Sequence, residues 1–301
     1  VGAPEQPRED KHPVRLFVGN GMRPDVWEQL LDRFGPADVL EFYASTEGNV
    51  ALGNLTGQKV GSVGRPLPGT DEVALVDYEV DAGRPLRDAD GRLTRVDDGQ
   101  PGLLVARISD DHPLSHFDGY LDEGQTEQKT IRDAFEPGDA WFNTGDLLER
   151  DAEGDFWFVD RIGDTFRWSG ENVSTDQVAR VVRKIDFVDR AVVYGVEVAG
   201  REGRAGMVAL VPTDPGAFDG EALFAAVDRN LFPAARPRFV RLVDAIETTD
   251  SFKFVKRDLR RQGADPTTVD DPVFYLDEEA ETYRPMTADD RPAELVTRRD
   301  P

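Results

Sequence analysis

The stretch VDRIGDTFRWSGENVST (Val159–Thr175) decides how this chain is organised. It begins at the end of an apolar run, FWFV, that predicts a strand. It ends next to Ser174, which forms a capping-box pattern with Gln177 and so predicts the start of a helix. Gly163 stands between these two elements, where a glycine lets the backbone torsions change at little steric cost. Because no Gly/Ser-rich linker is present, we expect a short hinge at this point and not a tether.

Two domains of different character are expected around this hinge. Residues 1–163 combine an α/β segment (residues 1–49) with a β-rich subdomain (about residues 50–163), whose short apolar runs and Gly/Pro/Asp turns are typical of a small antiparallel barrel or sandwich. Residues 164–301 predict a smaller α+β domain. From Pro266 onward Pro, Asp and Glu dominate, and we expect a surface-hugging tail there. The predicted fold class is therefore α/β and α+β.

The hydrophobic pattern places the elements within these domains. Strands are predicted at Val14–Val18, Val39–Tyr43, Val73–Tyr78, Leu103–Ile108, Phe142–Glu149, Phe156–Arg161, Ala191–Val198, Met207–Val211 and Phe239–Val243, and helices from Pro24 to Phe34, over Glu123–Phe135, from Ser174 to Ile185, over Phe224–Leu231 and over Val255–Gln262. Val14–Val18 is expected to be a buried strand. The polar loop Ala44–Asn49 follows the next strand, at the carboxyl end where α/β proteins favour ligands.

Charge and composition exclude several classes of function. With 36 basic and 59 acidic residues the net charge is 36 − 59 = −23, which repels phosphate backbones and disfavours nucleic-acid binding. The chain has no cysteine, so disulfides, thiolate zinc sites and a cysteine nucleophile are excluded. No apolar run approaches the roughly 18–20 residues of a membrane-spanning helix. The first residues, VGAPEQPRED, fit neither a signal peptide nor an initiator-methionine start, so we expect the chain to begin within a longer protein.

Five motifs stand in order along the chain and carry its functional signal. They are GNGMRPD (Gly19–Asp25), EFYASTEGN (Glu41–Asn49), WFNTGD (Trp141–Asp146), VDRIGDTFRWSGENVST (Val159–Thr175) and ETTDSFKFVKRDL (Glu247–Leu259). In this order and spacing the set resembles the C-terminal half of adenylate-forming enzymes, the acyl-CoA synthetase and luciferase superfamily. The fourth motif, with FDGEALF and TTDSFKFVK further on, is most similar to the very-long-chain acyl-CoA synthetase/fatty acid transport protein branch. The resemblance covers nearly the whole chain, and it implies the end of a large adenylation domain followed by the small C-terminal domain of AMP-binding enzymes.

The first two motifs offer groups for a nucleotide and its metal. Activation of an acid by ATP brings two anions together, so catalysis depends mainly on positioning and charge neutralisation. A hydroxyl can hold a phosphate oxygen and a carboxylate is a suitable ligand for Mg²⁺, and the resemblance assigns these roles to Thr46 and Glu47. It further implies that Tyr43 stacks on adenine and that Gly19 and Gly21 contact the nucleotide. A polar loop beside a core tyrosine is the alternative.

The third and fourth motifs offer groups for the ribose. An ionised carboxylate can accept hydrogen bonds from both ribose hydroxyls. The resemblance places Asp146 there, with Arg161 also reaching toward the nucleotide. Taken singly, Asp146 is better explained as a turn residue and Arg161 as part of a surface ion pair.

The fourth motif also carries the implied hinge. In the family that it resembles, the residue matching Asp164 is the hinge about which the C-terminal domain rotates between adenylation and thioester formation. The loop Arg167–Asn172, with Gly170 inside it, would then face the channel for the pantetheine of coenzyme A. Trp168 in this loop is better explained as a core aromatic.

Lys253 in the fifth motif is the predicted catalytic cation, acting with Thr46 and Glu47. An ammonium between the attacking carboxylate and the α-phosphate stabilises charge in the transition state, and the resemblance assigns this role to Lys253. The family pattern usually has glycine before this lysine, whereas this chain has Phe252, which bears on the freedom of the loop. Lys256 competes for the role, and we interpret it as a solvated neighbour.

The resemblance implies an ATP-dependent long- or very-long-chain fatty acyl-CoA synthetase. Such an enzyme, an acid–thiol ligase, converts fatty acid, ATP and CoA to acyl-CoA, AMP and diphosphate through an acyl-AMP, with Mg²⁺ as cofactor, and it can be coupled to fatty acid uptake. The Ser/Thr/Gly-rich phosphate loop of the family is not among these residues, so we expect a C-terminal fragment that is inactive in isolation. Fatty acid, ATP and CoA are the expected partners, and nucleic acid is not. The expected location is cytoplasmic, and peripheral association with the inner face of the cell membrane stays open, as do the oligomeric state and the acyl chain length.

Two alternatives remain at the level of the sequence. A non-catalytic nucleotide- or acyl-carrier-binding module would keep the fold, although retention of Glu47, Asp146, Arg161 and Lys253 argues against such decay. The same chemistry on an amino or aryl acid is the other alternative, which the wording of the fourth motif disfavours.

Overall fold

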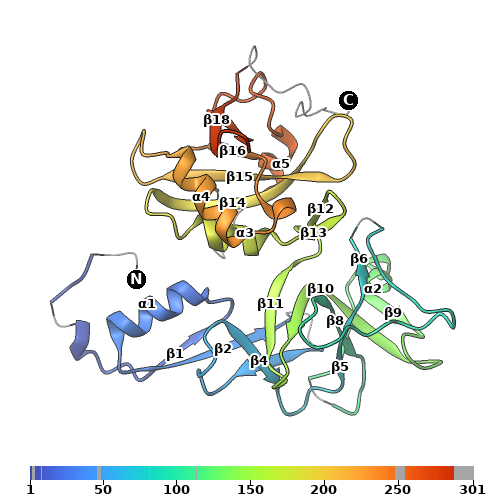
Figure 1. The fold of residues 1–301 in the computed structure, drawn as a ribbon. Helices are drawn as coiled ribbons and strands as arrows, with labels where there is room; N and C mark the ends of the chain where they lie inside the picture. The colour runs from blue at the N-terminus through green and yellow to red at the C-terminus, as the bar shows by residue number, and fades with distance from the viewer. Residues whose placement is uncertain are drawn as a thin grey trace. The chain divides into compact units, whose positions relative to one another are not determined.

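The computed structural model describes residues 1, 4–7, 9–45, 49–80, 82–112, 114–247 and 255–287. Contacts within the chain divide it into two units, residues 1–79 with 84–159 and residues 80–83 with 160–301 (Figure 1). The hinge predicted at Asp164 falls near the start of the second unit.

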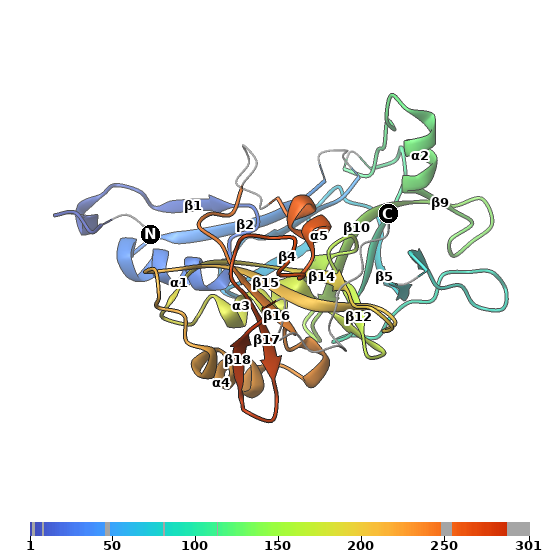
Figure 2. The same cartoon turned by 90° about the horizontal axis from the view of Figure 1, so that it is seen from above.

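The first unit opens with a β–α–β segment, as predicted. β1 (Leu16–Gly19) pairs in parallel with β2 (Asp38–Ala44), and α1 (Pro24–Phe34) connects them. Pro24 stands in the first turn, where its missing N–H costs no hydrogen bond, and Trp27 is fully buried. Figures 1 and 2 both show α1 lying along β1 and β2.

The strand β1 departs from the prediction in its burial. Val14–Val18 is predicted to be buried, whereas the side chains of Leu16 and Val18 are 49% and 60% exposed. β1 stands at one end of its sheet, and alternate side chains of a strand point to opposite faces. The apolar run therefore indicates the strand correctly but not its environment.

The rest of the first unit is rich in strands. These are β3 (Ala51–Asn54), β4 (Ser62–Pro66), β5 (Val73–Val76), β6 (Tyr78–Glu79), β7 (Arg84–Pro85), β8 (Gly102–Arg107), β9 (Thr130–Arg132), β10 (Ala140–Arg150) and β11 (Phe156–Arg161), with α2 (Glu123–Lys129) and the 3-10 helix η1 (Glu9–Lys11). The main sheet has the order β1-β2-β3-β4-β11-β10-β8-β5, and β9 pairs with β10. The predicted barrel is wrong for the described residues, in which no closed barrel forms. The pairing of β4 with β11 instead joins the β-rich strands to β1–β3 in one open sheet.

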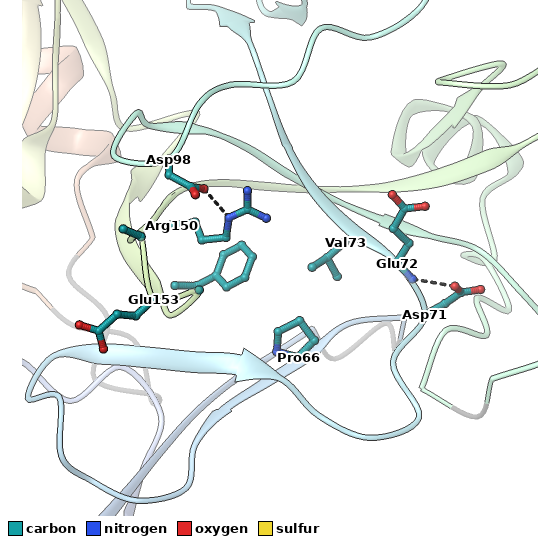
Figure 3. A pocket seen from close by; sticks show the side chains of 10 residues that line it. Pro66, Asp71, Glu72, Val73, Asp98, Arg150 and Glu153 are labelled. Atoms are coloured by element: carbon teal, nitrogen blue, oxygen red, sulfur yellow. Dashed lines mark hydrogen bonds and ion pairs between the residues drawn. The ribbon is translucent and has the colours of Figure 1, made fainter.

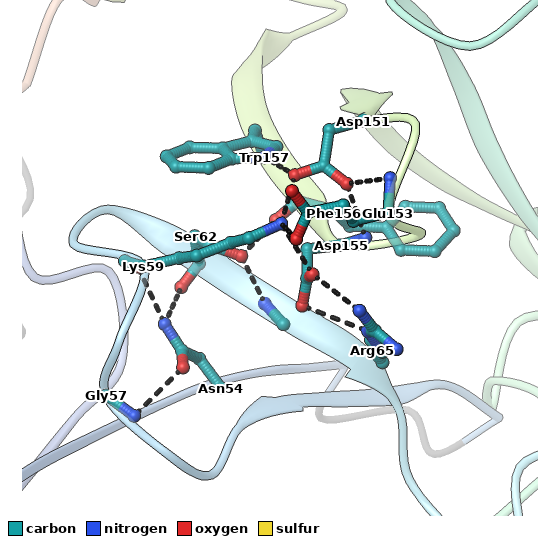
Figure 4. A network of polar contacts seen from close by, with 11 residues as sticks. Asn54, Gly57, Lys59, Ser62, Arg65, Asp151, Glu153, Asp155, Phe156 and Trp157 are labelled. Carbon is teal, nitrogen blue, oxygen red and sulfur yellow. Dashed lines mark hydrogen bonds and ion pairs between the residues drawn. The ribbon is translucent and has the colours of Figure 1, made fainter.

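The strands β10 and β11 form a hairpin, as predicted, and charged side chains hold its turn (Figure 4). Asp151 accepts hydrogen bonds from the backbone N–H groups of Glu153 and Asp155, both at 2.9 Å. The Nζ atom of Lys59 lies 2.7 Å from Asp151 and 2.8 Å from Asp155. Glu153 lies 3.0 Å from the same atom, and Arg65 reaches Asp155 at 3.0 Å. The loop before β4 is thereby tied to the turn between β10 and β11.

The helix α2 is shorter than predicted. The pattern predicts a helix over Glu123–Phe135, but the helix ends at Lys129 and the next residues pair with β10 as β9. Thr130 and Ile131 are β-branched, which favours a strand once a partner strand is present.

The second unit has the α+β character that the sequence predicts. Its elements are β12 (Phe166–Trp168), β13 (Glu171–Val173), α3 (Thr175–Val182), β14 (Val188–Glu197), β15 (Arg204–Pro212), α4 (Gly220–Asn230), the 3-10 helix η2 (Pro233–Ala235), β16 (Phe239–Leu242), α5 (Arg257–Gln262), β17 (Val273–Asp277) and β18 (Thr282–Pro285). The last five strands form one sheet in the order β14-β15-β16-β17-β18. Ser174 caps α3 by accepting the N–H of Gln177 at 3.1 Å, and Trp168 is 9% exposed within the core, so both predictions are confirmed. In the part of the chain that the structure describes, no helix is long and apolar enough to cross a membrane.

The end of the second unit contradicts the predicted surface tail. β17 and β18 extend the sheet, and Val273, Leu276 and Tyr283 in them are buried. In a strand only alternate residues face the core, so a segment whose average composition is acidic and polar can still supply a buried face. Composition alone therefore misjudged this segment.

Candidate functional site

Tyr43 and Asp146 meet in the first unit. Tyr43 lies on β2 and Asp146 on β10, and the Tyr43 hydroxyl donates a hydrogen bond of 2.7 Å to the Oδ2 atom of Asp146. Asp146 is 8% exposed, so its carboxylate is largely removed from water. A carboxylate can accept about four hydrogen bonds, so the bond from Tyr43 does not by itself exhaust it. Two residues that the sequence predicts to contact one nucleotide thus lie in direct contact.

A bulge in β10 determines where Asp146 points. The register of β10 against β8 shifts between Asn143 and Leu147. Gly145 adopts a φ of 78°, and its N–H donates to the Asn143 side chain at 3.0 Å. The Thr144 hydroxyl donates to the Leu104 carbonyl at 2.8 Å and accepts the N–H of Asp146 at 3.1 Å. The motif Asn-Thr-Gly-Asp is therefore a built turn inside a strand, and glycine is required there by the positive φ.

The turn after β1 is held by Glu41, a residue to which the sequence analysis gave no role. The Glu41 carboxylate accepts the backbone N–H of Gly21 and that of Met22, the latter at 3.0 Å. A Cβ atom on Gly19 would lie 2.3 Å from Glu41 Oε2, so no larger residue fits there without rearrangement. Gly21 has a φ of 81°. Because Glu41 already occupies these two N–H groups, the turn does not present them to a phosphate.

Glu41 is nearly fully buried, with 1% of its surface exposed. Burial raises the pKa of its carboxyl group, and the two backbone hydrogen bonds only partly oppose this. Glu41 and Tyr43 are two residues apart on β2 and so share one face of the sheet. The sequence carried one signal for this residue, a charged side chain in the middle of a buried strand.

The predicted hinge residue Asp164 is held by two cations. The Nζ atom of Lys256 lies 2.7 Å from its Oδ2 atom, and Arg260 pairs with its Oδ1 atom. Burial acts to raise the pKa of Asp164, but the two cations outweigh it and hold the pKa below its usual value. The interpretation of Lys256 as a solvated neighbour is wrong, because its side chain is 17% exposed and is paired. Its partner lies 92 residues away in sequence, which a local pattern does not reveal.

Arg161 stands at the end of β11 and belongs to the second unit, whereas Asp146 belongs to the first. Its carbonyl accepts the N–H groups of Asp164 and Thr165 at 2.8 and 2.9 Å, which forms the turn after the strand. The prediction that Arg161 and Asp146 contact one nucleotide stays a prediction.

Gly170 lies at the tip of a tight hairpin between β12 and β13. Ser169 and Gly170 both have positive φ, 51° and 86°, as a two-residue hairpin turn requires. A Cβ atom on Gly170 would meet nothing within 4 Å. Beside this hairpin is a pocket of about 460 Å³ with three arginines, Arg167, Arg201 and Arg204, among its lining residues. These arginines make the pocket basic, although the chain as a whole has a net charge of −23.

Three predicted residues lie outside the described part of the chain. These are Thr46, Glu47 and Lys253. The predicted metal ligand and the predicted catalytic lysine are therefore untested. Among the described residues, no group of three or more His, Asp or Glu side chains is arranged to hold a metal ion.

A second pocket, of about 440 Å³, lies in the first unit, and none of the predicted site residues that the structure describes lines it (Figure 3). Four carboxylates line it, those of Asp71, Glu72, Asp98 and Glu153. Its arginine, Arg150, is paired with Asp98 at 2.6 Å. A pocket with this charge repels phosphate groups, so it does not suit a nucleotide.

Comparison with models of known protein families shows which family the chain belongs to. Residues 2–107 match the family described as AMP-binding enzyme, and residues 177–253 match the AMP-binding enzyme C-terminal domain. This chain belongs to the AMP-binding enzymes. The two matches contain, respectively, Tyr43 with the Gly19–Gly21 turn and the region up to Lys253.

This member of the AMP-binding family is similar to fatty acid transport proteins and to a fatty-acid–CoA ligase. It is 47% identical over 291 residues to long-chain fatty acid transport protein 3 of Homo sapiens, covering 95% of this chain and 42% of the relative. It is 43% identical to the medium/long-chain-fatty-acid–CoA ligase FadD6 of Mycobacterium tuberculosis, covering 96% of this chain and 47% of the relative. The chain thus spans less than half the length of these relatives.

Solved structures confirm the fold. ATP-bound MatB from Rhodopseudomonas palustris superposes with a TM-score of 0.66 at 22% identity, covering 82% of this chain and 44% of that one. The amide bond synthetase McbA from Marinactinospora thermotolerans gives a TM-score of 0.61 at 26% identity, covering 81% and 45%. These structures confirm the predicted mixed α/β fold class, and the family-model matches confirm the predicted family.

Proposed function

We propose that this AMP-binding enzyme is part of an ATP-dependent long- or very-long-chain fatty acyl-CoA synthetase. The observation that carries the proposal is the hydrogen bond between Tyr43 and Asp146, which joins two residues of nucleotide-binding motifs across 103 positions of sequence. High identity to a fatty-acid–CoA ligase and to fatty acid transport proteins supports the choice of substrate.

The nucleotide is proposed to lie along the face of β2 that carries Tyr43. The tyrosine ring, fixed by its bond to Asp146, would stack on adenine, and Asp146 would accept the ribose hydroxyls. Gly19 and Gly21 would contact the base side of the nucleotide, because Glu41 already occupies N–H groups that a phosphate would need. Arg161 is proposed to approach the same nucleotide.

Two chemical steps then follow. An oxygen of the fatty-acid carboxylate attacks the α-phosphorus of ATP, the bond to diphosphate breaks, and an acyl-AMP results. The sulfur of CoA then attacks the acyl carbon, its proton is lost, and AMP leaves. Lys253 would neutralise the charge that develops between carboxylate and phosphate in the first step, and the Thr46 hydroxyl would hold a phosphate oxygen.

The chemistry of the loop after β2 suits a magnesium ion. Mg²⁺ in proteins is commonly held by one or two carboxylates together with phosphate oxygens and water. Glu47 would supply the carboxylate, and the ion would neutralise phosphate charge when bound. ATP is then proposed to enter as its magnesium complex.

Coenzyme A is proposed to use the second unit. Gly170 at the open tip of the β12–β13 hairpin would face the pantetheine arm. The pocket with Arg167, Arg201 and Arg204 offers positive charge for the phosphates of CoA. Asp164 is proposed as the hinge about which the C-terminal domain rotates, so that one of its surfaces serves adenylation and another serves thioester formation.

The relatives suggest the cellular setting. Several are named long-chain fatty acid transport proteins, so uptake coupled to thioester formation is proposed as the wider role. A cytoplasmic site of action with peripheral association at the inner membrane face is proposed with it. Fatty acid, ATP and CoA are the proposed partners.

Replacement of Lys253 by alanine tests the assignment in the intact enzyme. We expect Lys253→Ala to lower acyl-AMP formation by about 10²–10³-fold, as for the loss of a transition-state charge. Thioester formation from supplied acyl-AMP should stay within a few-fold of wild type. Release of diphosphate and formation of acyl-CoA, each followed by chromatography, measure the two steps.

Lys11→Ala is the matched control, because Lys11 is an exposed lysine outside the five motifs. It should leave both steps unchanged. Full adenylation by the Lys253→Ala enzyme would sink the assignment of this lysine. A panel of fatty, aryl and amino acids, with AMP binding measured alongside, separates the synthetase from a binding module or from an enzyme for another acid.

A further inference from the structure

Asp160 is a buried acid whose carboxylate accepts hydrogen bonds from Arg161 N–H before the predicted hinge and from Thr165 and Thr175 beyond it. It stands near the end of β11 and is 2% exposed. Its Oδ2 atom accepts the N–H of Thr175 at 2.5 Å, and its Oδ1 atom accepts the Thr175 hydroxyl at 3.1 Å. The Thr165 hydroxyl lies 3.3 Å from the same carboxylate. One carboxylate therefore connects the end of β11 with the start of α3, on either side of Asp164.

Thr175 extends this connection to Lys256. The Thr175 side chain is buried, and the Nζ atom of Lys256 lies 3.1 Å from its oxygen. An ammonium group can only donate, so Lys256 donates to Thr175 and Thr175 in turn donates to Asp160. The same Nζ atom pairs with Asp164 at 2.7 Å, and Arg260 pairs with the other oxygen of Asp164.

These residues, Asp160, Asp164, Thr175, Lys256 and Arg260, form what we call the hinge cluster, with two negative and two positive charges. Burial raises the pKa of Asp160, and the charge of Lys256 opposes that rise. The side chains of Asp164, Lys256 and Arg260 are 28%, 17% and 30% exposed, so the cluster is only partly buried, and we expect it to add little net stability over apolar packing. Removing one charged member still leaves an unbalanced charge. Its effect is therefore to favour one geometry over others.

A rotation at Asp164 divides the hinge cluster into two groups. Asp160 precedes the hinge along the chain, whereas Thr175 and Lys256 follow it, and contacts in this structure group all three in the second unit. Hydrogen bonds between nitrogen and oxygen span about 2.7–3.2 Å and are lost soon beyond that. A large rotation at Asp164 therefore breaks both bonds between Asp160 and Thr175, and it leaves their buried polar groups in need of new partners.

We propose that Asp160 and Thr175 are positioning residues of the ligase, whose mutual hydrogen bonds stabilise one of its two hinge states against the other. The inference rests on the proposed function, because each of the two hinge states serves one of its two steps, acyl-AMP formation or thioester formation. Neither residue touches substrate in this scheme. They act through Asp164, by setting how often the hinge occupies each state.

Lys256 links this equilibrium to the predicted catalytic lysine. It stands directly before the first residue of α5 and follows Lys253 by three residues. Lys256 donates hydrogen bonds to both Asp164 and Thr175. Among the described residues with a contact to Asp164, it is the one nearest in sequence to Lys253. A hinge state that breaks the cluster thus also releases a restraint close to Lys253 in the chain.

Removal of one hydroxyl group tests the proposal in the intact enzyme. Thr175→Val keeps the buried volume but loses the bonds to Asp160 and Lys256 that the hydroxyl makes, while the backbone N–H bond remains. We expect the ratio of acyl-AMP formation to thioester formation to change by at least about fivefold, equivalent to about 1 kcal/mol between the two hinge states. Thr175→Ser restores the hydroxyl and should return the ratio to within about twofold of wild type.

The outcomes are distinct. Equal slowing of both half-reactions in Thr175→Val, or a serine variant that behaves like the valine variant, overturns the proposal in favour of a merely structural link. A valine variant with the wild-type ratio overturns it as well. An intact wild-type enzyme that forms no acyl-CoA defeats the proposed function instead, and hydrogen exchange then decides about the cluster by itself.

Hydrogen exchange on the 301-residue chain supplies that second readout. In Thr175→Val, a peptide covering residues 160–175 should exchange about five- to tenfold faster than in wild type or Thr175→Ser. A peptide from β14, in the core of the same unit, should be unchanged. Faster exchange in both peptides would indicate general loss of stability and would contradict a local role.

Discussion

The hydrogen bond from Tyr43 constrains Asp146, because this carboxylate is only 8% exposed and has lost most of its water. A buried acceptor that loses one of its donors is less well compensated for its desolvation. The tyrosine is constrained in return, since its hydroxyl must stay within about 3 Å of the carboxylate. At the scale of single residues, the pair is the feature on which nucleotide binding is proposed to depend.

Tyr43→Phe tests this pair in the intact enzyme. The substitution keeps the ring and removes only the hydroxyl, so the carboxylate of Asp146 loses one donor and its fixed orientation. We expect the KM for ATP and the Kd for AMP to rise about tenfold, which corresponds to about 1.4 kcal/mol, within the range for a hydrogen bond to a charged group. Isothermal titration of AMP and steady-state kinetics measure these quantities.

Tyr275→Phe is the control for that substitution. Tyr275 is a half-buried tyrosine of β17 in the other unit, and its variant should bind AMP as wild type does. An unchanged AMP affinity in Tyr43→Phe would contradict the role proposed for the pair.

The motifs singled out Tyr43, Asp146 and Asp164 as candidate site residues, but they did not predict which side chains these residues contact. Tyr43 and Asp146 were each ambiguous from local sequence, and only contact between β2 and β10 relates them. Lys256 was misread for the same reason, since its partner Asp164 is distant in sequence. Glu41 was missed because a strand pattern does not show which backbone groups a buried carboxylate will meet.

At the scale of elements, the turn between β10 and β11 is stabilised by ion pairs in addition to its own backbone hydrogen bonds. Asp151 lies at its start, and burial acts to raise the pKa of this residue. Hydrogen bonds from Lys59, from backbone N–H groups of the turn and from the Trp157 indole outweigh burial and hold the pKa well below its usual value. We therefore expect the hairpin to be more stable when Asp151 is ionised and can accept these hydrogen bonds (Figure 4).

Acid titration of stability tests that dependence. A carboxyl group whose pKa is lower in the folded than in the unfolded chain adds stability above its unfolded pKa of about 4, and this is lost as the pH falls. In Asp151→Asn we expect lower stability at pH 7 and a smaller further loss between pH 7 and pH 3. Urea unfolding followed by tryptophan fluorescence at the two pH values measures both effects.

Asp90→Asn is the control, since Asp90 lies on an exposed turn. Its stability should follow the wild-type pH dependence. A parallel pH dependence for Asp151→Asn and wild type would show that the ionised form of Asp151 is not what the hairpin needs.

Elements with strong local signals were predicted well. The capping box before α3 and the hairpin turn formed as expected, because each is stabilised by contacts within a few residues. The helix α2 was predicted too long, since pairing with β10 offers Thr130–Arg132 a partner strand that a local pattern does not contain.

At the scale of the whole molecule, the net charge and the share of the relatives' length that the chain spans determine what activity we expect of it. A net charge of −23 does not attract ATP, CoA or a fatty-acid carboxylate, so the proposed function requires local cations, and we propose that Lys253 and the pocket with three arginines supply them. The chain spans 42–47% of the ligase and transport proteins cited above. The Ser/Thr/Gly-rich phosphate loop that the resemblance implies is not in its sequence.

We therefore expect the 301-residue chain alone to show little or no ligase turnover. An assay with palmitate, ATP, Mg²⁺ and CoA measures this, with the intact enzyme as the positive control. Turnover by the chain within tenfold of the intact enzyme would contradict the expectation and would show that the phosphate loop is dispensable.

The sequence by itself determined the family, the order of the motifs, the mixed α/β character and most element positions, because motifs, caps and periodicity act over a few residues. Only the tertiary structure decided that the β-rich strands form an open sheet, that the acidic segment after Pro266 adds two strands, and that Asp160, Thr175 and Lys256 form a cluster around Asp164. These features depend on pairing between distant segments. The stability of such a pair comes from burial and from hydrogen bonds that exist only once both partners are in place.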